Sequence, residues 1–163
     1  MKNLLIYLSV IALFFGANAQ NEKAAKYNNN LMKYQLATSI DISSFFHHIK
    51  HSKYEQIEAA HTKVDKSLDV LRAKVDKMGG FEGDNTLHDA LNEWIKGYEE
   101  SFDNEYKQML PLFKNEKRSA EENAKLNKMH DDLIAEEKVM DEKLVAAQKE
   151  FAKKYELIPA AGQ

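Results

Sequence analysis

The sequence predicts an all-α protein, an antiparallel up-down-up-down four-helix bundle preceded by a signal peptide. Three observations support this prediction. No glycine or proline lies between Gly16 and Gly79, strand-type alternation of apolar and polar residues is missing, and apolar residues recur three or four positions apart in four segments. Because 163 residues fit one domain, we expect a signal peptide over 1–19 and a single bundle domain over 20–163.

The signal peptide is predicted from three consecutive features. Lys2 supplies a positive start, Leu4–Phe15 forms a mostly apolar run, and Ala17-Asn18-Ala19 provides the small residues of an A-x-A cleavage site. The run is shorter than the roughly 20 residues that cross a bilayer as a helix. No later stretch of the sequence has that length and apolarity. We therefore expect cleavage after Ala19 and an exported mature chain without a transmembrane segment, located in the periplasm, at the cell surface or outside the cell.

The first helix is predicted over about 22–50. Its seam positions step by three or four residues: Tyr27, Leu31, Tyr34, Thr38, Ile42, Phe45 and Ile49. The polar run over 38–44 weakens the helical pattern, because Ser and Asp side chains compete for the local backbone groups. A turn near 41 is thus the alternative to a turn near 52. We prefer the turn near 52, since it makes the first two helices similar in length.

The second helix is predicted over 53–78, where the periodicity is clearest. Its seam has coiled-coil-like heptad spacing and is interrupted once, by a histidine: Ile57, His61, Val64, Leu68, Leu71, Val75 and Met78. Ser52 and Glu55 form an S-x-x-E capping box at its start. Gly79 and Gly80 end it, because glycine readily adopts the positive φ of a C-terminal cap.

The third helix is predicted over 86–113, after a loop at 81–85. Pro111 lies in its last turn and is expected to kink or end it. Its seam residues are Leu87, Leu91, Trp94, Tyr98, Phe102, Met109 and Phe113. The aromatic side chains are expected in the core or at its edge, with each tyrosine hydroxyl reaching water.

The fourth helix is predicted over 120–156. A second capping box, Ser119 with Glu122, starts it, and Pro159 closes it. Its seam residues are Leu126, Met129, Leu133, Met140, Leu144, Ala147 and Phe151. The remaining face is dense in Glu and Lys and is interpreted as a solvated face.

Composition and motifs exclude several functional classes. The chain has no cysteine, which rules out disulfides, thiolate metal sites and a cysteine nucleophile. A formal net charge of −3 argues against nucleic-acid binding, which needs a clustered positive excess. The sequence contains no G-x-S-x-G, Walker, Rossmann or H-E-x-x-H motif. We therefore expect a protein that is not an enzyme and has no cofactor.

His61 is the most informative candidate site residue, because it replaces an apolar residue in a regular seam. With turns near 52, 82 and 116, antiparallel geometry puts Asp41, Asp103 and His130 close to its depth in the bundle. We interpret His61 as a buried residue that hydrogen-bonds Asp41 or Thr38 and fixes helix register. The alternative is a metal or ligand site formed by His61, His130, Asp41 and Asp103, with zinc or copper as the metal.

A second, smaller candidate is the histidine group at the end of the first helix. His47 and His51 lie at i and i+4 and share a helix face. Two imidazoles at this spacing can chelate Zn²⁺ or Cu²⁺. Histidine side chains also interact favourably with the negative end of the helix dipole. Because the sequence fixes no third metal ligand, we favour this structural role over a metal site.

The layout resembles exported helical surface proteins of Gram-negative bacteria, in a family named for a leptospiral surface protein. The resembling features are the signal peptide ending at Ala19, the turn Met78-Gly79-Gly80-Phe81-x-Gly83-Asp84 and the stretch Tyr106-x-x-Met109-Leu110. This resemblance implies an exported helical protein and supplies no catalytic residues.

The function expected from the sequence is therefore that of an exported, non-enzymatic helical bundle of the cell envelope, a protein-binding or surface module with an unknown protein partner. The alternative is a periplasmic metal- or small-ligand-binding bundle with a polar core site around His61 and His130.

Overall fold

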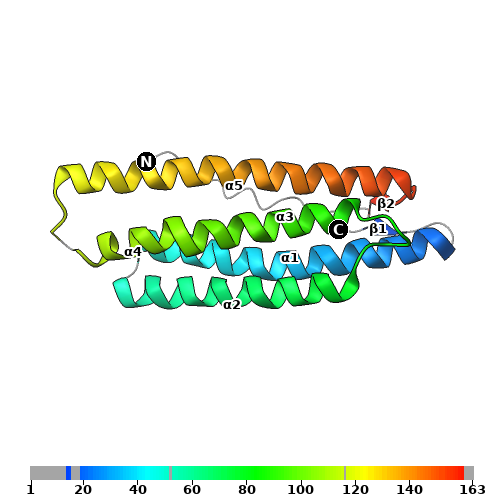
Figure 1. Cartoon of the computed structure of the whole chain (residues 1–163), viewed down its shortest axis with the longest axis horizontal. Helices are drawn as coiled ribbons and strands as arrows, with labels where there is room; N and C mark the ends of the chain where they lie inside the picture. Colours follow the sequence, from blue (N-terminus) through cyan, green and yellow to red (C-terminus); the bar gives the residue numbers. More distant parts are fainter. Residues whose placement is uncertain (1–13, 16–18, 52, 116, 160–163) are drawn as a thin grey trace.

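The computed structural model describes residues 14–15, 19–51, 53–115 and 117–159. Its elements in chain order are β1 (Phe14–Phe15), α1 (Ala19–His51), α2 (Tyr54–Met78), α3 (Thr86–Glu100), the π-helix η1 (Ser101–Tyr106), α4 (Lys107–Lys114), α5 (Ala120–Lys154) and β2 (Ile158–Pro159). The elements α3, η1 and α4 follow one another without a break and form the third long rod of the molecule (Figure 1).

The four rods pack antiparallel along a common direction (Figure 1). Neighbours along the chain pack side by side: α1 on α2, α2 on α3, and α3 on α5. The all-α prediction with four antiparallel helices is confirmed. The short strands β1 and β2 pair antiparallel, with Phe14 opposite Pro159. Most of the predicted signal peptide, 1–13 and 16–18, lies outside the described residues. Within the described part, no helix combines the length and apolarity needed to cross a membrane.

The helix α1 runs unbroken through the polar run 38–44, so the alternative turn near 41 is wrong. The first turn lies near 52, as preferred. The helix α2 begins at Tyr54, and the backbone N–H of Lys53 donates to Gln56 Oε1 at 3.3 Å. The predicted capping residue Ser52 lies outside the described residues. The burial of Val64, Leu68 and the other seam positions of α2 matches the predicted face.

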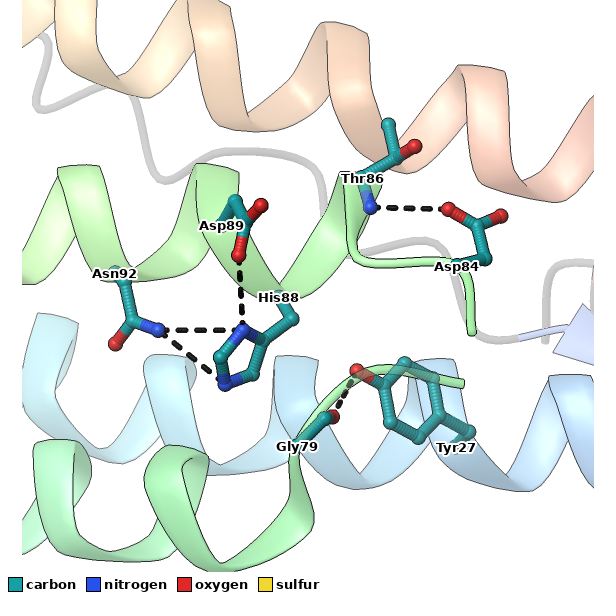
Figure 2. Close-up of polar contacts among 7 residues, drawn as sticks. All are labelled: Tyr27, Gly79, Asp84, Thr86, His88, Asp89 and Asn92. Carbon is teal, nitrogen blue, oxygen red and sulfur yellow. Dashed lines mark hydrogen bonds and ion pairs between the residues drawn. The ribbon is translucent and has the colours of Figure 1, made fainter. Parts of the chain in front are cut away.

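The turn between α2 and α3 is held by a set of polar contacts, drawn in Figure 2. Gly79 has φ +60°, and its carbonyl accepts a 2.7 Å hydrogen bond from the Tyr27 hydroxyl. Asp84 accepts from the Thr86 backbone N–H at 3.0 Å and pairs with Lys154 at 2.8 Å. These hydrogen bonds lower the pKa of Asp84 to about 2 against the effect of its burial. The turn therefore ties α1, α2, α3 and α5 together at one end.

The third rod differs from the prediction of a plain α-helix over 86–113. A π-helical segment, η1, replaces the α-helical backbone over Ser101–Tyr106, and Pro111 lies inside α4, which ends at Lys114. Apolar positions here step by four residues three times, from Trp94 to Tyr98, Phe102 and Tyr106. Steps of four drift around a regular α-helix, whereas the wider i→i+5 turn keeps them on one face. All four side chains are buried.

The helix α5 begins with the predicted capping box. Glu122 N–H donates to Ser119 Oγ at 3.1 Å, and Ser119 N–H donates to Glu122 Oε2 at 2.7 Å. The helix ends at Lys154, two residues before the predicted end.

Two aromatic clusters close the bundle between α1 and α5. At one end, Tyr27 of α1 contacts Phe151 of α5, with ring centroids 5.6 Å apart. Toward the other end lies what we call the aromatic layer: Phe45, Phe46, Phe102 and Tyr106. Phe46 also contacts His130 of α5, at 6.2 Å between ring centroids. Between the two clusters, the apolar core also contains the buried polar residues Gln35 and Glu137.

Candidate functional site

A group of polar side chains within the core is built around two carboxyl groups of α5, Glu137 and Asp141. They lie four residues apart and so share one helix face, which α5 turns toward α3 and η1. The indole N–H of Trp94 donates to Asp141 Oδ1 at 2.7 Å. The Tyr98 hydroxyl hydrogen-bonds the same carboxyl, and the Tyr106 hydroxyl faces Glu137. We call these five residues the acidic cluster.

Burial makes Glu137 an unusual carboxyl group. Only 5% of this residue is exposed. Burial raises the pKa of Glu137 to about 8 by penalising the ionised form; interaction with Tyr106 lowers it, and the negative charges of Asp141 and Glu136 add to the rise. At neutral pH the Glu137 side chain is therefore mostly the neutral acid, which can donate as well as accept a hydrogen bond.

Asp141 is less buried and titrates lower. Burial raises its pKa to about 6, while the hydrogen bonds from Trp94 and Tyr98 stabilise the ionised form and lower it. Burial also raises the pKa of both Tyr98 and Tyr106 well above the ordinary value, and the neighbouring carboxyls add to this. Both phenols are therefore neutral hydrogen-bond donors across the physiological range.

Hydrogen bonding in this region is incomplete. Tyr106 Oη and Glu137 Oε1 are both buried, and neither has a well-formed hydrogen bond in the described part of the chain. A third such atom is Gln35 Oε1 of α1. The contact of Asn28 with Gln148 and that of Phe46 with His130 set the register of α1 against α5, which places Gln35 level with Asp141. Leaving such atoms unsatisfied typically costs about 1–3 kcal/mol each, so this layer is held at some cost in stability.

A groove lies on the outer side of the acidic cluster, between α3 and α5. It has a volume of about 210 Å³ and an apolar floor that includes Trp94, Gly97 and Met140. Its rim carries charges of both signs, among them Glu93 and Lys143. Trp94 thus belongs to both features: its ring lines the groove while its indole N–H holds Asp141. Gly97 leaves room for Met140 of α5, since a Cβ at position 97 would lie 1.8 Å from Met140 Sδ and would force that side chain to move.

His61 forms a separate polar site against η1. The residue is 5% exposed, and its Nε2 lies 2.8 Å from the Phe102 carbonyl oxygen. Because a carbonyl only accepts, Nε2 carries the proton of this bond. Nδ1 lies 3.1 Å from Asp65 Oδ2. Burial raises the pKa of Asp65, the nearby Asp103 raises it further, and His61 and Lys107 lower it.

The structure confirms that His61 is buried, whereas the predicted partners are wrong. Asp41 Oδ1 pairs with Lys63 at 2.7 Å. Thr38 bonds Ser67, accepting from its hydroxyl at 3.1 Å. The antiparallel arithmetic fixes only the depth of a residue along the bundle. It does not fix the side of the helix from which the side chain projects, and Asp41 and Thr38 project toward other residues of α2.

The structure does not bring the predicted metal ligands together. His130 packs on Phe46, and its Nδ1 lies 3.8 Å from Asp131. His61 packs on Phe45 and Phe102, so the contacts that link the two imidazoles run through the aromatic layer. Asp103 is exposed on η1. Across the described residues, no group of three or more His, Asp or Glu side chains is arranged to hold a metal ion.

The histidines at the end of α1 do share a face. The ring centroids of His47 and His51 are 4.9 Å apart, and both residues are exposed. The two exposed imidazole rings therefore offer two nitrogen ligands for a metal ion on the surface of α1.

Sequence reasoning missed the acidic cluster. A signal was present: the predicted seam of the fourth helix steps from Leu133 directly to Met140, and the position between them at helical spacing is Glu137. The same logic that singled out His61 as a polar interruption applies there. The tyrosine hydroxyls of Tyr98 and Tyr106, predicted to reach water, instead face the carboxyls of α5.

No family model, no curated protein and no solved structure matches this chain.

Proposed function

We propose that the protein is an exported, non-enzymatic helical-bundle protein of the cell envelope that binds a protein partner through the groove between α3 and α5. The groove carries this proposal. The half-buried Met140 on its floor is of a residue type enriched at protein interfaces, and methionine adapts its shape to what it contacts. The charged rim provides polar contacts around an apolar centre, as protein interfaces do.

The size of the groove favours a protein partner over a small-molecule ligand. Its volume of about 210 Å³ is below the roughly 300–1,000 Å³ of typical small-molecule pockets. It suits a single large side chain inserted as an anchor, the arrangement that concentrates binding energy at the centre of an interface.

Export is supported by the order of Lys2, Leu4–Phe15 and Ala17-Asn18-Ala19. The bundle starts where this segment ends: α1 begins at Ala19, and its first buried residues are Asn21 and Ala24. Cleavage after Ala19 would therefore leave the bundle core intact and remove β1.

The test is site-specific photo-crosslinking in the producing cells. A photoreactive residue at Lys143, on the groove rim, should give one discrete adduct in the envelope fraction. The matched control is the same residue at Lys149, an exposed position further along α5, which should give none. Gly97→Ala forces Met140 to move and should abolish the adduct from position 143. Equal adducts from both positions, or none from either, would contradict the proposal.

A further inference from the structure

We propose that the acidic cluster is a proton-controlled contact: with Glu137 and Asp141 neutral, the middle of α5 is seated on α3 and η1, and ionisation of the two carboxyls releases it from them. The ends of α5 stay in place in both states. The proposal is independent of which partner the protein binds.

The helix α5 is held in place by contacts near both of its ends. At its C-terminal end, Phe151 packs on Tyr27 and Phe81, and Lys154 pairs with Asp84. Toward its N-terminal end, His130 packs on Phe46. These contacts are aromatic or lie at the surface, and none needs a neutral carboxyl group.

The middle of α5 is held differently. Between Leu133 and Leu144, both 2% exposed, the side chains directed at α3 and η1 are Glu137 and Asp141, beside Met140 over Gly97. Their partners are the indole N–H of Trp94 and the hydroxyls of Tyr98 and Tyr106. This stretch therefore depends on two titratable groups, the buried Glu137 and the half-buried Asp141.

The groups that surround Glu137 and Asp141 are neutral or negatively charged. From α3, Tyr98 faces both carboxyls, and from η1, Tyr106 faces Glu137, with Glu105 acting on Tyr106. On α5 itself, Glu136 adds a negative charge. Among the described residues, no basic side chain influences the pKa of either carboxyl.

From α1, the side chain level with Asp141 is the neutral Gln35. The basic residues closest in sequence are engaged elsewhere: Lys138 pairs with Glu142 on the outer face of α5, and Lys143 lies on the groove rim. Two ionised carboxylates would thus share a buried site with no counter-charge. Such a site is unstable, because each ion is poorly solvated and repels the other.

The pH of the surroundings decides whether Glu137 and Asp141 are ionised. The pKa values of about 8 for Glu137 and about 6 for Asp141 place both ionisations within the physiological range. Water is the strongest available stabiliser of the ions, and its entry requires the α3–α5 contact to loosen. The Tyr106 hydroxyl and Glu137 Oε1, which form no well-aligned hydrogen bond among the described residues, mark where the seated state already lacks good hydrogen bonds.

The experiment uses Trp94, which is the only tryptophan of the chain and reports directly on Asp141. Acrylamide quenching of its fluorescence is measured on the mature protein from about pH 5 to about pH 9. In parallel, amide hydrogen exchange is followed in 133–144 and in α2, corrected for the intrinsic pH effect. Each proton released on opening should raise the open population by up to about tenfold per pH unit.

The wild type should show quenching and exchange in 133–144 that rise with pH, while α2 stays protected. The double variant Glu137→Gln/Asp141→Asn keeps both side chains neutral and should remain protected at every pH. The charge-matched control, Glu142→Gln/Glu150→Gln on the exposed face of α5, should behave as the wild type.

Three results would overturn the proposal. They are a flat wild-type profile, a pH response that persists in Glu137→Gln/Asp141→Asn, and loss of protection in α2 together with 133–144, which would mean global unfolding. If the double variant does not fold, each single variant should show about half of the wild-type pH slope, since one proton is removed from the linkage. A pH slope equal to that of the wild type in both single variants would also overturn the proposal.

Discussion

Trp94 and Asp141, 47 positions apart in the chain, are joined by a 2.7 Å hydrogen bond from the indole N–H to a carboxyl oxygen. The bond links α3 to α5 in the part of the core that holds the buried carboxyl group of Glu137. It also connects the floor of the surface groove to the buried carboxyls, because Trp94 lines the groove. The groove and the acidic cluster are two sides of one helix interface.

The pH dependence of stability should reveal the acidic cluster. The folded-state pKa values of Glu137 (about 8) and Asp141 (about 6) lie above the ordinary values of 4.5 and 3.8, so the folded state holds more protons than the unfolded state between them. The contribution of these two carboxyls to stability is therefore fully present below about pH 4, falls as the pH rises and is lost above about pH 8. Urea unfolding should show a slope of up to about 1.4 kcal/mol per pH unit for each proton.

Glu137→Gln should reduce that slope, and the exposed Glu150→Gln should leave it unchanged. A free energy of unfolding that increases steadily from pH 5 to pH 8 in the wild type would show that other groups dominate the titration.

His61→Leu should destabilise the fold by about 1–3 kcal/mol in urea unfolding, because it leaves the Phe102 carbonyl and Asp65 without their partner. His61→Gln retains an N–H donor and should lose less. Equal losses in the two variants would mean that the hydrogen bond to η1 contributes nothing and that only the volume of the ring matters.

Leu68→Ala should cost about 2–5 kcal/mol, since Leu68 is 1% exposed in the core of α2 and its truncation leaves a cavity. Lys66→Ala, an exposed position on the same helix, should stay within about 0.5 kcal/mol. Thermal or chemical unfolding compares the unfolding midpoints of the two variants. Similar effects would contradict the assignment of the buried face.

Export should be visible as a cleaved N-terminus. Intact-mass measurement on protein from the envelope fraction should give a chain beginning at Gln20, with or without cyclisation of that residue. Replacing Ala19 by a bulky residue should block processing, because the cleavage site needs small side chains. A mature mass that still includes Met1 to Ala19 would refute the prediction.

The parts of the fold that follow local rules could be predicted from the sequence. Ser119 and Glu122 start α5 as the capping box requires, and the heptad spacing of Val64, Leu68 and Leu71 marks the buried face of α2. The burial of His61 follows from the same spacing. Each of these depends on residues within a few positions of one another, where backbone geometry alone decides the outcome.

The parts of the fold that depend on the rotation of a helix about its own axis could not be predicted from the sequence. The spacing predicts a buried His61 with Asp41 or Thr38 as its partner, yet its acceptor is the Phe102 carbonyl in η1. The π-helical turn that presents this carbonyl changes which side of the third rod faces the core. Glu137 was hidden by its residue type: on a helix rich in Glu and Lys, a single buried glutamate differs from its neighbours only in its position on the seam.

Glu137 is a buried, neutral acid at physiological pH, and both the acidic cluster and the seating of α5 depend on this state. NMR titration of its side-chain carboxyl carbon, assigned by comparison with Glu137→Gln, measures this directly. The structure predicts a midpoint at about pH 8. A midpoint near the ordinary glutamate value of 4.5 would show that the carboxyl is solvated and would contradict both the acidic cluster and the proton-controlled seating of α5.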